Sequence, residues 1–214
     1  MSGPAAKKER GIPFTDAMVQ AILADDKTVT RRIVRKEMRP LPGHSWRSCD
    51  CRDIDPSDTP CVVCFARFGE CPYGRPGDRL WVREAWRTEK DHDGAPPREI
   101  PEGAPTRYEA DGAVLDEDGG RSLVWGRYRH ARFMPRWAGR LDVDVVSVRV
   151  ERLHDITDGD AILEGCSWRA LPPGMPGTRT PPRDCYAELW DAINGAGSFA
   201  LDPWVWRIEF RISP

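Results

Sequence analysis

The sequence has no long apolar run and almost no excess of one charge. Nothing in its 214 residues approaches the roughly 18 consecutive apolar residues of a membrane-spanning helix, and residues 1–10 lack the apolar segment of a secretory signal. The 32 basic and 34 acidic residues leave a net charge of −2, so no global field attracts the chain to nucleic acid or to an anionic membrane. These features predict a cytoplasmic protein with no membrane partner.

The chain also lacks internal repeats, and its length suffices for one domain with a sizeable core. We expect a single domain over residues 11–214, preceded by a flexible polar tail over 1–10. Two stretches poor in apolar runs are expected to be insertions, at about 40–75 and 88–139. Within the second, residues 88–118 contain ten acidic and three basic residues, a composition that predicts a mobile segment.

The cysteines are odd in number and unevenly placed, which argues against a secreted disulfide framework. Five of the seven lie between residues 49 and 71, and their spacing is typical of a zinc knuckle, in which four thiolates hold a loop without a core of its own. The predicted ligands of this structural zinc are Cys51, Cys61, Cys64 and Cys71. The alternative is a group of reduced thiols in a surface insertion.

Residues 119–140 combine arginine with aromatic side chains. This segment has six arginines and no acid, interleaved with Trp125, Tyr128, Phe133 and Trp137. Arginines beside aromatic rings suit phosphate contact and base stacking, which indicates an RNA-binding surface. An arginine-rich loop that covers the acidic residues 88–118 explains the pattern equally well.

Hydrophobic periodicity predicts a mixed α+β fold. Inside a long predicted strand, the apolar residues shift from odd-numbered positions, up to Val145, to even-numbered positions, from Val146 on. Such a shift is typical of a bulge or bend where a sheet curls. We therefore expect a small curled sheet with helices packed over its openings. Helices are expected from Thr15 to about Asp25, from Thr157 to Gly165 and over 183–194, and strands over 80–86, 140–153 and 204–212.

The stretch from Lys27 to Arg32 follows the first of these helices and offers the most distinctive chemistry. It carries an amine, two hydroxyls and two guanidinium groups on six consecutive residues. If the helix end bends into a turn, Lys27 and Thr30 converge, and a neutral amine beside a threonine hydroxyl can generate a nucleophile. The competing interpretation is a solvated basic surface.

Two glutamates occupy positions that are unusual for acids. Glu164 falls in the last turn of a predicted helix, where the helix dipole disfavours a carboxylate and so favours the proton-carrying form. The alternative is a solvent-facing glutamate. Glu84 shares a strand face with Leu80 and Val82, so we expect it to lie at the open end of the strand or to pair with a base.

Several of these segments together resemble the ASCH domain family. The resemblance rests on the helix that leads into Lys27–Arg32, the strand over 77–84, the valine-rich strand followed by Ile156-Thr157 and Glu164-Gly165, and the closing strand over 204–210. It covers most of the chain outside the cysteine-rich window and residues 88–118. The resemblance implies a PUA-like β-barrel, in a long form that occurs in phages and prophages. One departure is Asp25, which stands where the family pattern begins with glycine.

One branch of that family consists of small amidohydrolases that remove the acyl group from N4-acetylcytidine and related N4-acylcytosines. They use a lysine, a threonine three residues later and a glutamate from the capped helix. The matching positions here are Lys27, Thr30 and Glu164. The wider family usually has glutamate where this chain has Thr30. The resemblance therefore implies an amidohydrolase that acts on a nucleoside or nucleobase and needs no cofactor for catalysis.

Further residues are expected to contact the substrate or the oxyanion, namely Arg32, Arg83 and Glu84. Two other functions remain open at this point. One is a PUA-like module that binds RNA or modified nucleic acid without chemistry, and the other is a ribonuclease.

Overall fold

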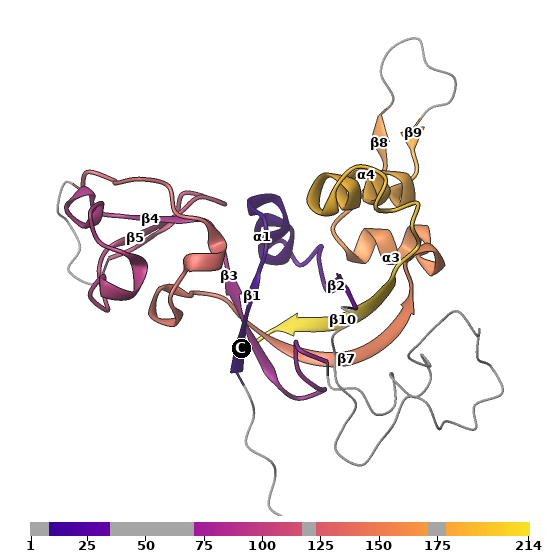
Figure 1. Ribbon diagram of the computed structural model, residues 1–214, viewed down its shortest axis with the longest axis horizontal. Coiled ribbons are helices and arrows are strands. Elements are labelled where there is room, and N and C mark those ends of the chain that lie inside the picture. Colours follow the sequence, from indigo (N-terminus) through magenta and orange to yellow (C-terminus); the bar gives the residue numbers. More distant parts are fainter. Residues whose placement is uncertain (1–8, 35–70, 117–122, 171–178) are drawn as a thin grey trace, which may run out of the picture. The chain divides into compact units, whose positions relative to one another are not determined.

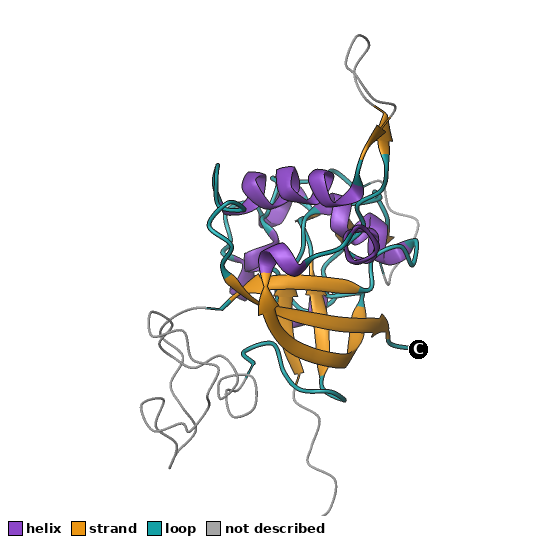
Figure 2. Cartoon of the chain, turned by 90° about the vertical axis from the view of Figure 1, so that its right-hand side faces the viewer, coloured by secondary structure: helices purple, strands orange, loops and turns teal. Residues whose placement is uncertain are grey.

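The computed structural model describes residues 9–34, 71–116, 123–170 and 179–214, which form a mixed α+β fold (Figure 1). Its helices and strands are interspersed along the chain. Figure 2 colours the helices purple and the strands orange. The α-helices are α1 (Asp16–Leu23), α3 (Asp158–Leu163) and α4 (Pro182–Asn194). Short 3-10 helices cover Lys90–His92, Pro97–Glu99, Ala131–Phe133, Arg136–Ala138 and Leu153–Asp155.

The largest sheet has the strand order β1–β3–β7–β10–β2. Its strands are β1 (Glu9–Pro13), β2 (Val29–Ile33), β3 (Arg79–Arg83), β7 (Asp142–Arg152) and β10 (Trp204–Ile212). Strand β1 pairs parallel with β3, whereas β3 with β7 and β10 with β2 are antiparallel. Among the described residues β1 and β2 are the edge strands and the sheet is open, so the expected closed barrel is not confirmed.

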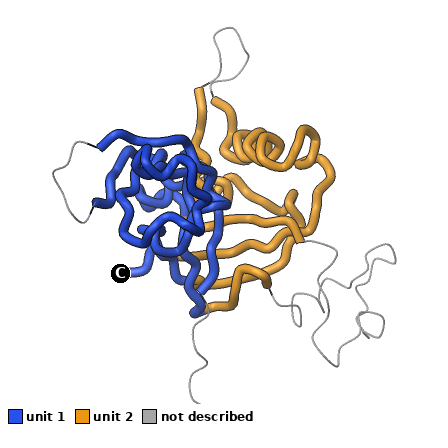
Figure 3. The backbone as a smooth tube through the Cα atoms, turned by 60° about the vertical axis from the view of Figure 1, so that its left-hand side comes forward, with its two compact units in different colours: residues 1–27, 77–144, 211–214 blue, residues 28–76, 145–210 orange. Residues whose placement is uncertain are grey.

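The chain divides into two compact units, and the division falls inside β7 (Figure 3). Unit 1 comprises residues 1–27, 77–144 and 211–214, and unit 2 comprises residues 28–76 and 145–210. Strand β1, at the start of unit 1, was not predicted, and it begins within the expected polar tail. In the part of the chain that the structure describes, no helix is long and apolar enough to cross a membrane.

Unit 1 contains the first predicted helix. Thr15 caps α1 as expected, because its Oγ1 accepts a hydrogen bond from the Met18 backbone N–H at 3.4 Å. Val19 and Ile22 form the buried face of the helix. At the other end, the backbone N–H groups of Asp26 and Lys27 both donate to the carbonyl of Ala21, at 2.9 and 3.0 Å. The chain thus turns sharply between α1 and Lys27.

Asp25 makes that turn in a left-handed conformation, with φ of 61°. Glycine adopts this conformation without a steric penalty and aspartate with a moderate one, so Asp25 supplies the bend at a position where the pattern of the resembled family has glycine.

We expect Asp25→Gly to leave the free energy of unfolding unchanged or raised, and Asp25→Ala to lower it by about 1 kcal/mol. Urea denaturation measures both. Asp26→Ala is the matched control, expected within about 0.5 kcal/mol of wild type; equal losses at both positions would contradict this account of the turn.

The acidic segment of unit 1 is built into a second sheet. Strands β4 (Trp86–Thr88), β5 (Thr106–Tyr108) and β6 (Val114–Leu115) pair in that order. A hydrophobic cluster lies under them, made of Trp86, Ile100, Ala104, Tyr108, Met134 and Ala138. The prediction of a mobile segment over 88–118 is therefore wrong for the described residues, 88–116. The expected strand over 80–86 is also two strands, because β3 ends at Arg83 and β4 begins at Trp86.

Unit 2 contains the capped helix and the closing strand. Thr157 and Asp160 form the predicted capping box of α3, and Gly165, with φ of 88°, follows its end. Helices α3 and α4 share one buried cluster, formed by Leu153, Ile156, Ala161, Cys166, Tyr186, Trp190 and Val205. Strand β10, predicted over 204–212, has a neighbour on each side, and its residues 205–208 are buried on both faces. The hairpin of β8 (Arg169–Ala170) and β9 (Arg179–Thr180) completes the unit.

Candidate functional site

The three predicted catalytic side chains are buried polar groups. Lys27 is 1% exposed, Thr30 2% and Glu164 3%. Lysine and glutamate are almost never so deeply buried unless their charges are paired. The competing interpretations, a solvated basic surface after α1 and a solvent-facing Glu164, are therefore wrong.

These residues belong to different units. Lys27 ends the first segment of unit 1, where its Nζ lies 5.9 Å from the centroid of the Phe14 ring. Unit 2 contains Thr30 on β2 and Glu164 at the C-terminal end of α3.

Within unit 2, backbone hydrogen bonds bring the start of the Thr28–Ile33 segment against the end of α3. The Thr28 N–H donates to the carbonyl of Leu163 at 2.9 Å, and the Phe210 N–H donates to the carbonyl of Thr28 at 2.9 Å. Glu164 is the next residue after Leu163. The fold thus carries a carboxyl group that is distant in sequence to the strand that bears Thr30.

Arg31 links that strand directly to Glu164. Its Nη1 lies 3.1 Å from Glu164 Oε1, its Nε 2.8 Å from Glu151 Oε1, and its Nη2 3.4 Å from Asp160 Oδ1. Burial alone would lower the pKa of Arg31, but the surrounding carboxylates outweigh burial and raise it above its usual value. Arg31 is therefore a firmly held cation beside the predicted acid.

The sequence did not reveal the contacts of Arg31. In the sequence Arg31 is only one of two guanidinium groups in a basic stretch. Strand alternation gave a signal, because it puts Arg31 on the opposite face of β2 from Thr30 and Arg32. Burial of both Thr30 and Arg31 requires a strand covered on both faces, and the basic composition of the stretch gave no hint of that.

Two more groups of unit 2 share the electrostatic environment of Glu164. Arg32, the predicted substrate contact, is half-buried, and burial lowers its pKa although Tyr73 and Glu164 oppose that shift. Tyr186 of α4 is buried, and burial together with the charge of Glu164 raises its pKa well above its usual value. The sequence predicted a helix over 183–194, but the proximity of Tyr186 to charged groups is a second feature that it did not reveal.

The other two predicted substrate contacts lie in unit 1 and are occupied by structural partners. Arg83 donates through Nη2 to the carbonyls of Arg132 and, at 3.3 Å, of Met134. Glu84 is fully buried, and Arg140 holds both of its oxygens at 2.8 Å. Burial raises the pKa of Glu84, and the bonds from Arg140 offset part of that shift. The prediction that Glu84 pairs with a base is confirmed, and the base is Arg140.

The arginine-rich segment contacts the acidic segment within unit 1. Arg129 donates to the carbonyls of His92 and Ala95, at 2.7 and 3.3 Å, and Arg140 Nη1 lies 2.9 Å from Asp111 Oδ2. These contacts confirm the interpretation that residues 123–140 cover residues 88–116. An RNA-binding role for the same segment stays a prediction.

The structure describes only one of the four predicted zinc ligands. Cys51, Cys61 and Cys64 lie outside the described residues, and Cys71 is buried. In the four described ranges no group of three or more His, Cys, Asp or Glu side chains could hold a metal ion. The structural zinc therefore stays a prediction.

Comparison of the chain with protein-family models, with curated proteins and with solved structures gives no match. What remains to indicate a function is the burial and contacts of Lys27, Thr30 and Glu164 and the resemblance of the sequence to the ASCH domain family.

Proposed function

We propose that this protein is an amidohydrolase of the ASCH type, with a PUA-like fold, that removes the acyl group from N4-acetylcytidine or related N4-acylcytosines. The observation that supports the proposal best is the pairing of the Thr28–Ile33 segment with the end of α3. It joins the strand of Thr30 to the residue before Glu164 through the Thr28 to Leu163 hydrogen bond of 2.9 Å. The deep burial of Lys27, Thr30 and Glu164 also supports it, because a dry site is what an uncharged lysine needs.

In the first half of the proposed reaction, Lys27 in its neutral form takes the proton from the Thr30 hydroxyl. Thr30 Oγ1 attacks the acyl carbonyl carbon, and Glu164 gives its proton to the departing N4 amine, so that the C–N bond breaks and cytidine leaves. An ordinary lysine, with a pKa of about 10.4, is charged at neutral pH. The step therefore requires the neutral amine form of Lys27, which burial favours.

In the second half, water hydrolyses the acyl-threonine ester. Glu164, now a carboxylate, takes a proton from the attacking water, and Lys27 returns its proton to Thr30 Oγ1 as the ester bond breaks. The carboxylic acid leaves, and both groups regain their starting protonation. The reaction consumes one water and needs no cofactor.

The test is a panel of N4-acylated cytosines, as free base and as nucleoside, incubated with the purified wild-type protein. We expect cytidine and carboxylate to appear in equal amounts from N4-acetylcytidine. N6-acetyladenosine is the matched control, because it presents the same amide on a different base. An RNA oligonucleotide in a parallel incubation should stay intact. RNA cleavage without deacylation would support the ribonuclease instead, and salt-dependent RNA binding without either reaction would support the binding module.

A further inference from the structure

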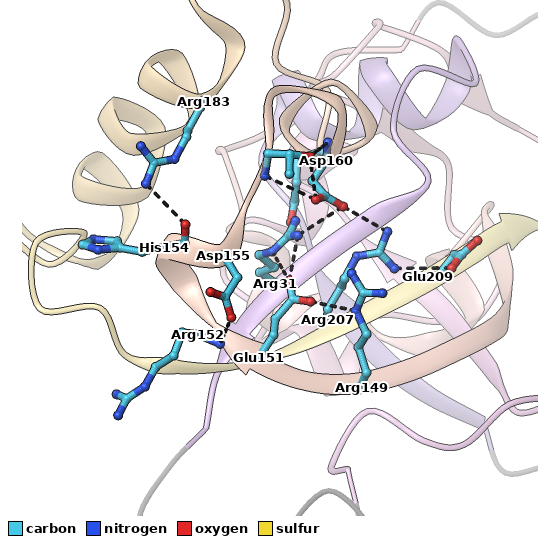
Figure 4. A network of polar contacts seen from close by, with 12 residues as sticks. Arg31, Arg149, Glu151, Arg152, His154, Asp155, Asp160, Arg183, Arg207 and Glu209 are labelled. Atoms are coloured by element: carbon cyan, nitrogen blue, oxygen red, sulfur yellow. Dashed lines mark hydrogen bonds and ion pairs between the residues drawn. The ribbon is translucent and has the colours of Figure 1, made fainter. Parts of the chain in front are cut away.

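Two arginines lie directly opposite each other in unit 2, on neighbouring antiparallel strands. Arg31 of β2 is paired in register with Arg207 of β10, and both are buried. Like charges in this arrangement repel each other. Asp160 offsets the repulsion, since its Oδ1 lies 3.4 Å from Arg31 Nη2 and 3.3 Å from Arg207 Nη2 (Figure 4).

The carboxylates around the two arginines are themselves fixed. Asp160 Oδ2 accepts a hydrogen bond from Thr157 Oγ1 at 2.8 Å in the capping box of α3. Glu151 Oε2 accepts one from Arg149 Nε at 2.7 Å, while its Oε1 lies 2.7 Å from Arg31 Nη2. Arg31 is thus anchored on two sides by carboxylates that cannot easily move (Figure 4).

The anchored side determines where the rest of the guanidinium points. The group is planar, so fixing Nε and Nη2 on Glu151 also fixes the direction of Nη1. Nη1 meets Glu164 Oε1 at 3.1 Å, with 0% and 2% of the two side chains exposed. Arg207 differs in this respect, because it pairs with Asp160 and Glu209.

We propose that Arg31 is a positioning residue that orients the Glu164 carboxyl group for acyl transfer. The inference rests on the proposed function. Glu164 must give a proton to the leaving amine and then take one from water at nearly the same place, so a carboxyl group held through Oε1 suits both steps.

Two other groups of unit 2 also interact with the charge of Glu164, namely Arg32 of β2 and Tyr186 of α4. Neither is substituted in the variants below, so a difference between Arg31→Met and the wild-type protein reports the loss of Arg31.

The experiment compares Arg31→Met, Arg31→Lys and Arg207→Met in the full chain with N4-acetylcytidine as substrate. Arg31→Met should lower kcat about 100-fold with little change in KM, because Glu164 loses the group that orients it. Arg31→Lys keeps the charge but loses the planar guanidinium fork, so kcat should fall while KM stays the same. Arg207→Met removes the same charge from the network without touching Glu164, and its kcat should stay within a few-fold of wild type.

A double-mutant cycle separates positioning from structural support. If Arg31 acts through Glu164, Arg31→Met in a Glu164→Gln background should cost no further activity. Additive losses, or an equal fall of kcat in Arg207→Met, would overturn the inference. Should Arg31→Met fail to fold, full activity of Arg31→Lys would overturn it as well.

The inference can fail separately from the proposed function. If the wild-type protein releases no carboxylate from the panel, the proposed function fails. The 13C carboxyl signal of Glu164 then tests the inference alone. Its chemical shift and line width at pH 7 should change in Arg31→Met and stay as in the wild-type protein in Arg207→Met, and the same signal in all three proteins would refute the role of Arg31.

Discussion

Replacement of Thr30 by alanine is expected to lower the release of carboxylate from N4-acetylcytidine by at least about 10⁴-fold, because the substitution removes the proposed nucleophile. Lys27→Met should lose activity to a similar extent. Lys27→Arg should also be inactive, since a guanidinium stays charged and cannot accept the proton of a threonine hydroxyl. The measurement is kcat/KM by chromatography of cytidine.

Thr28→Ala is the matched control for Thr30→Ala. Thr28 is in the same stretch, but its described contacts run through backbone atoms, to Leu163 and Phe210, and these survive the substitution. We expect activity within a few-fold of wild type. Full activity in Thr30→Ala, with a folded protein by circular dichroism, would show that the role assigned to Thr30 is wrong.

A covalent intermediate is a further consequence of the same assignment. Acid quenching of the wild-type protein during turnover of N4-acetylcytidine stops hydrolysis of the acyl-threonine ester. Intact-protein mass spectrometry should then find a protein that carries one acetyl group, and peptide mapping should place it on Thr30. An acetyl group on Lys27 instead would identify the lysine as the nucleophile.

The local features of the fold could be predicted from the sequence. The caps at Thr15 and Thr157, the helix end at Gly165 and the strand 204–212 depend on residues close together in the chain, and all are confirmed. Short-range hydrogen bonds fix the two caps and the helix end, so the chemistry of a few neighbouring residues predicts them. The strand pairs with distant β2, but the alternation of its apolar residues is visible in the local sequence.

The features that the sequence did not reveal depend on distant partners. Arg31 lies 133 residues from Glu164, and Arg140 lies 56 residues from Glu84. The order of residues 88–116 likewise depends on Met134 and Ala138, which complete the buried cluster from another part of the chain. Composition predicted mobility because it counts apolar residues and does not show which of them meet.

Arg140→Met is expected to lower the free energy of unfolding by about 3–5 kcal/mol at pH 7, because it leaves the buried Glu84 without its counter-charge. Glu84 is fully buried, and both of its oxygens bind Arg140 at 2.8 Å. Arg136→Met is the matched control in the same unit. Arg136 pairs with Glu9 at 2.7 Å, but the two side chains are 43% and 42% exposed, so its loss should cost at most about 1 kcal/mol.

The cost of Arg140→Met should depend on pH with a definite sign. Burial raises the pKa of Glu84 in the folded protein even with Arg140 present. A group with a raised folded-state pKa contributes its stability below the unfolded-state pKa and loses that contribution as the pH rises through the folded-state value. Removal of Arg140 raises the pKa of Glu84 further, so urea denaturation should find the variant closest to wild type near pH 4 and most destabilised near pH 8.

Adding Glu84→Gln to Arg140→Met should recover part of the lost free energy of unfolding at pH 8 and remove most of its pH dependence. A loss in Arg140→Met that is independent of pH would mean that the packing of Arg140 on the Tyr108 ring, 4.1 Å away, dominates its contribution.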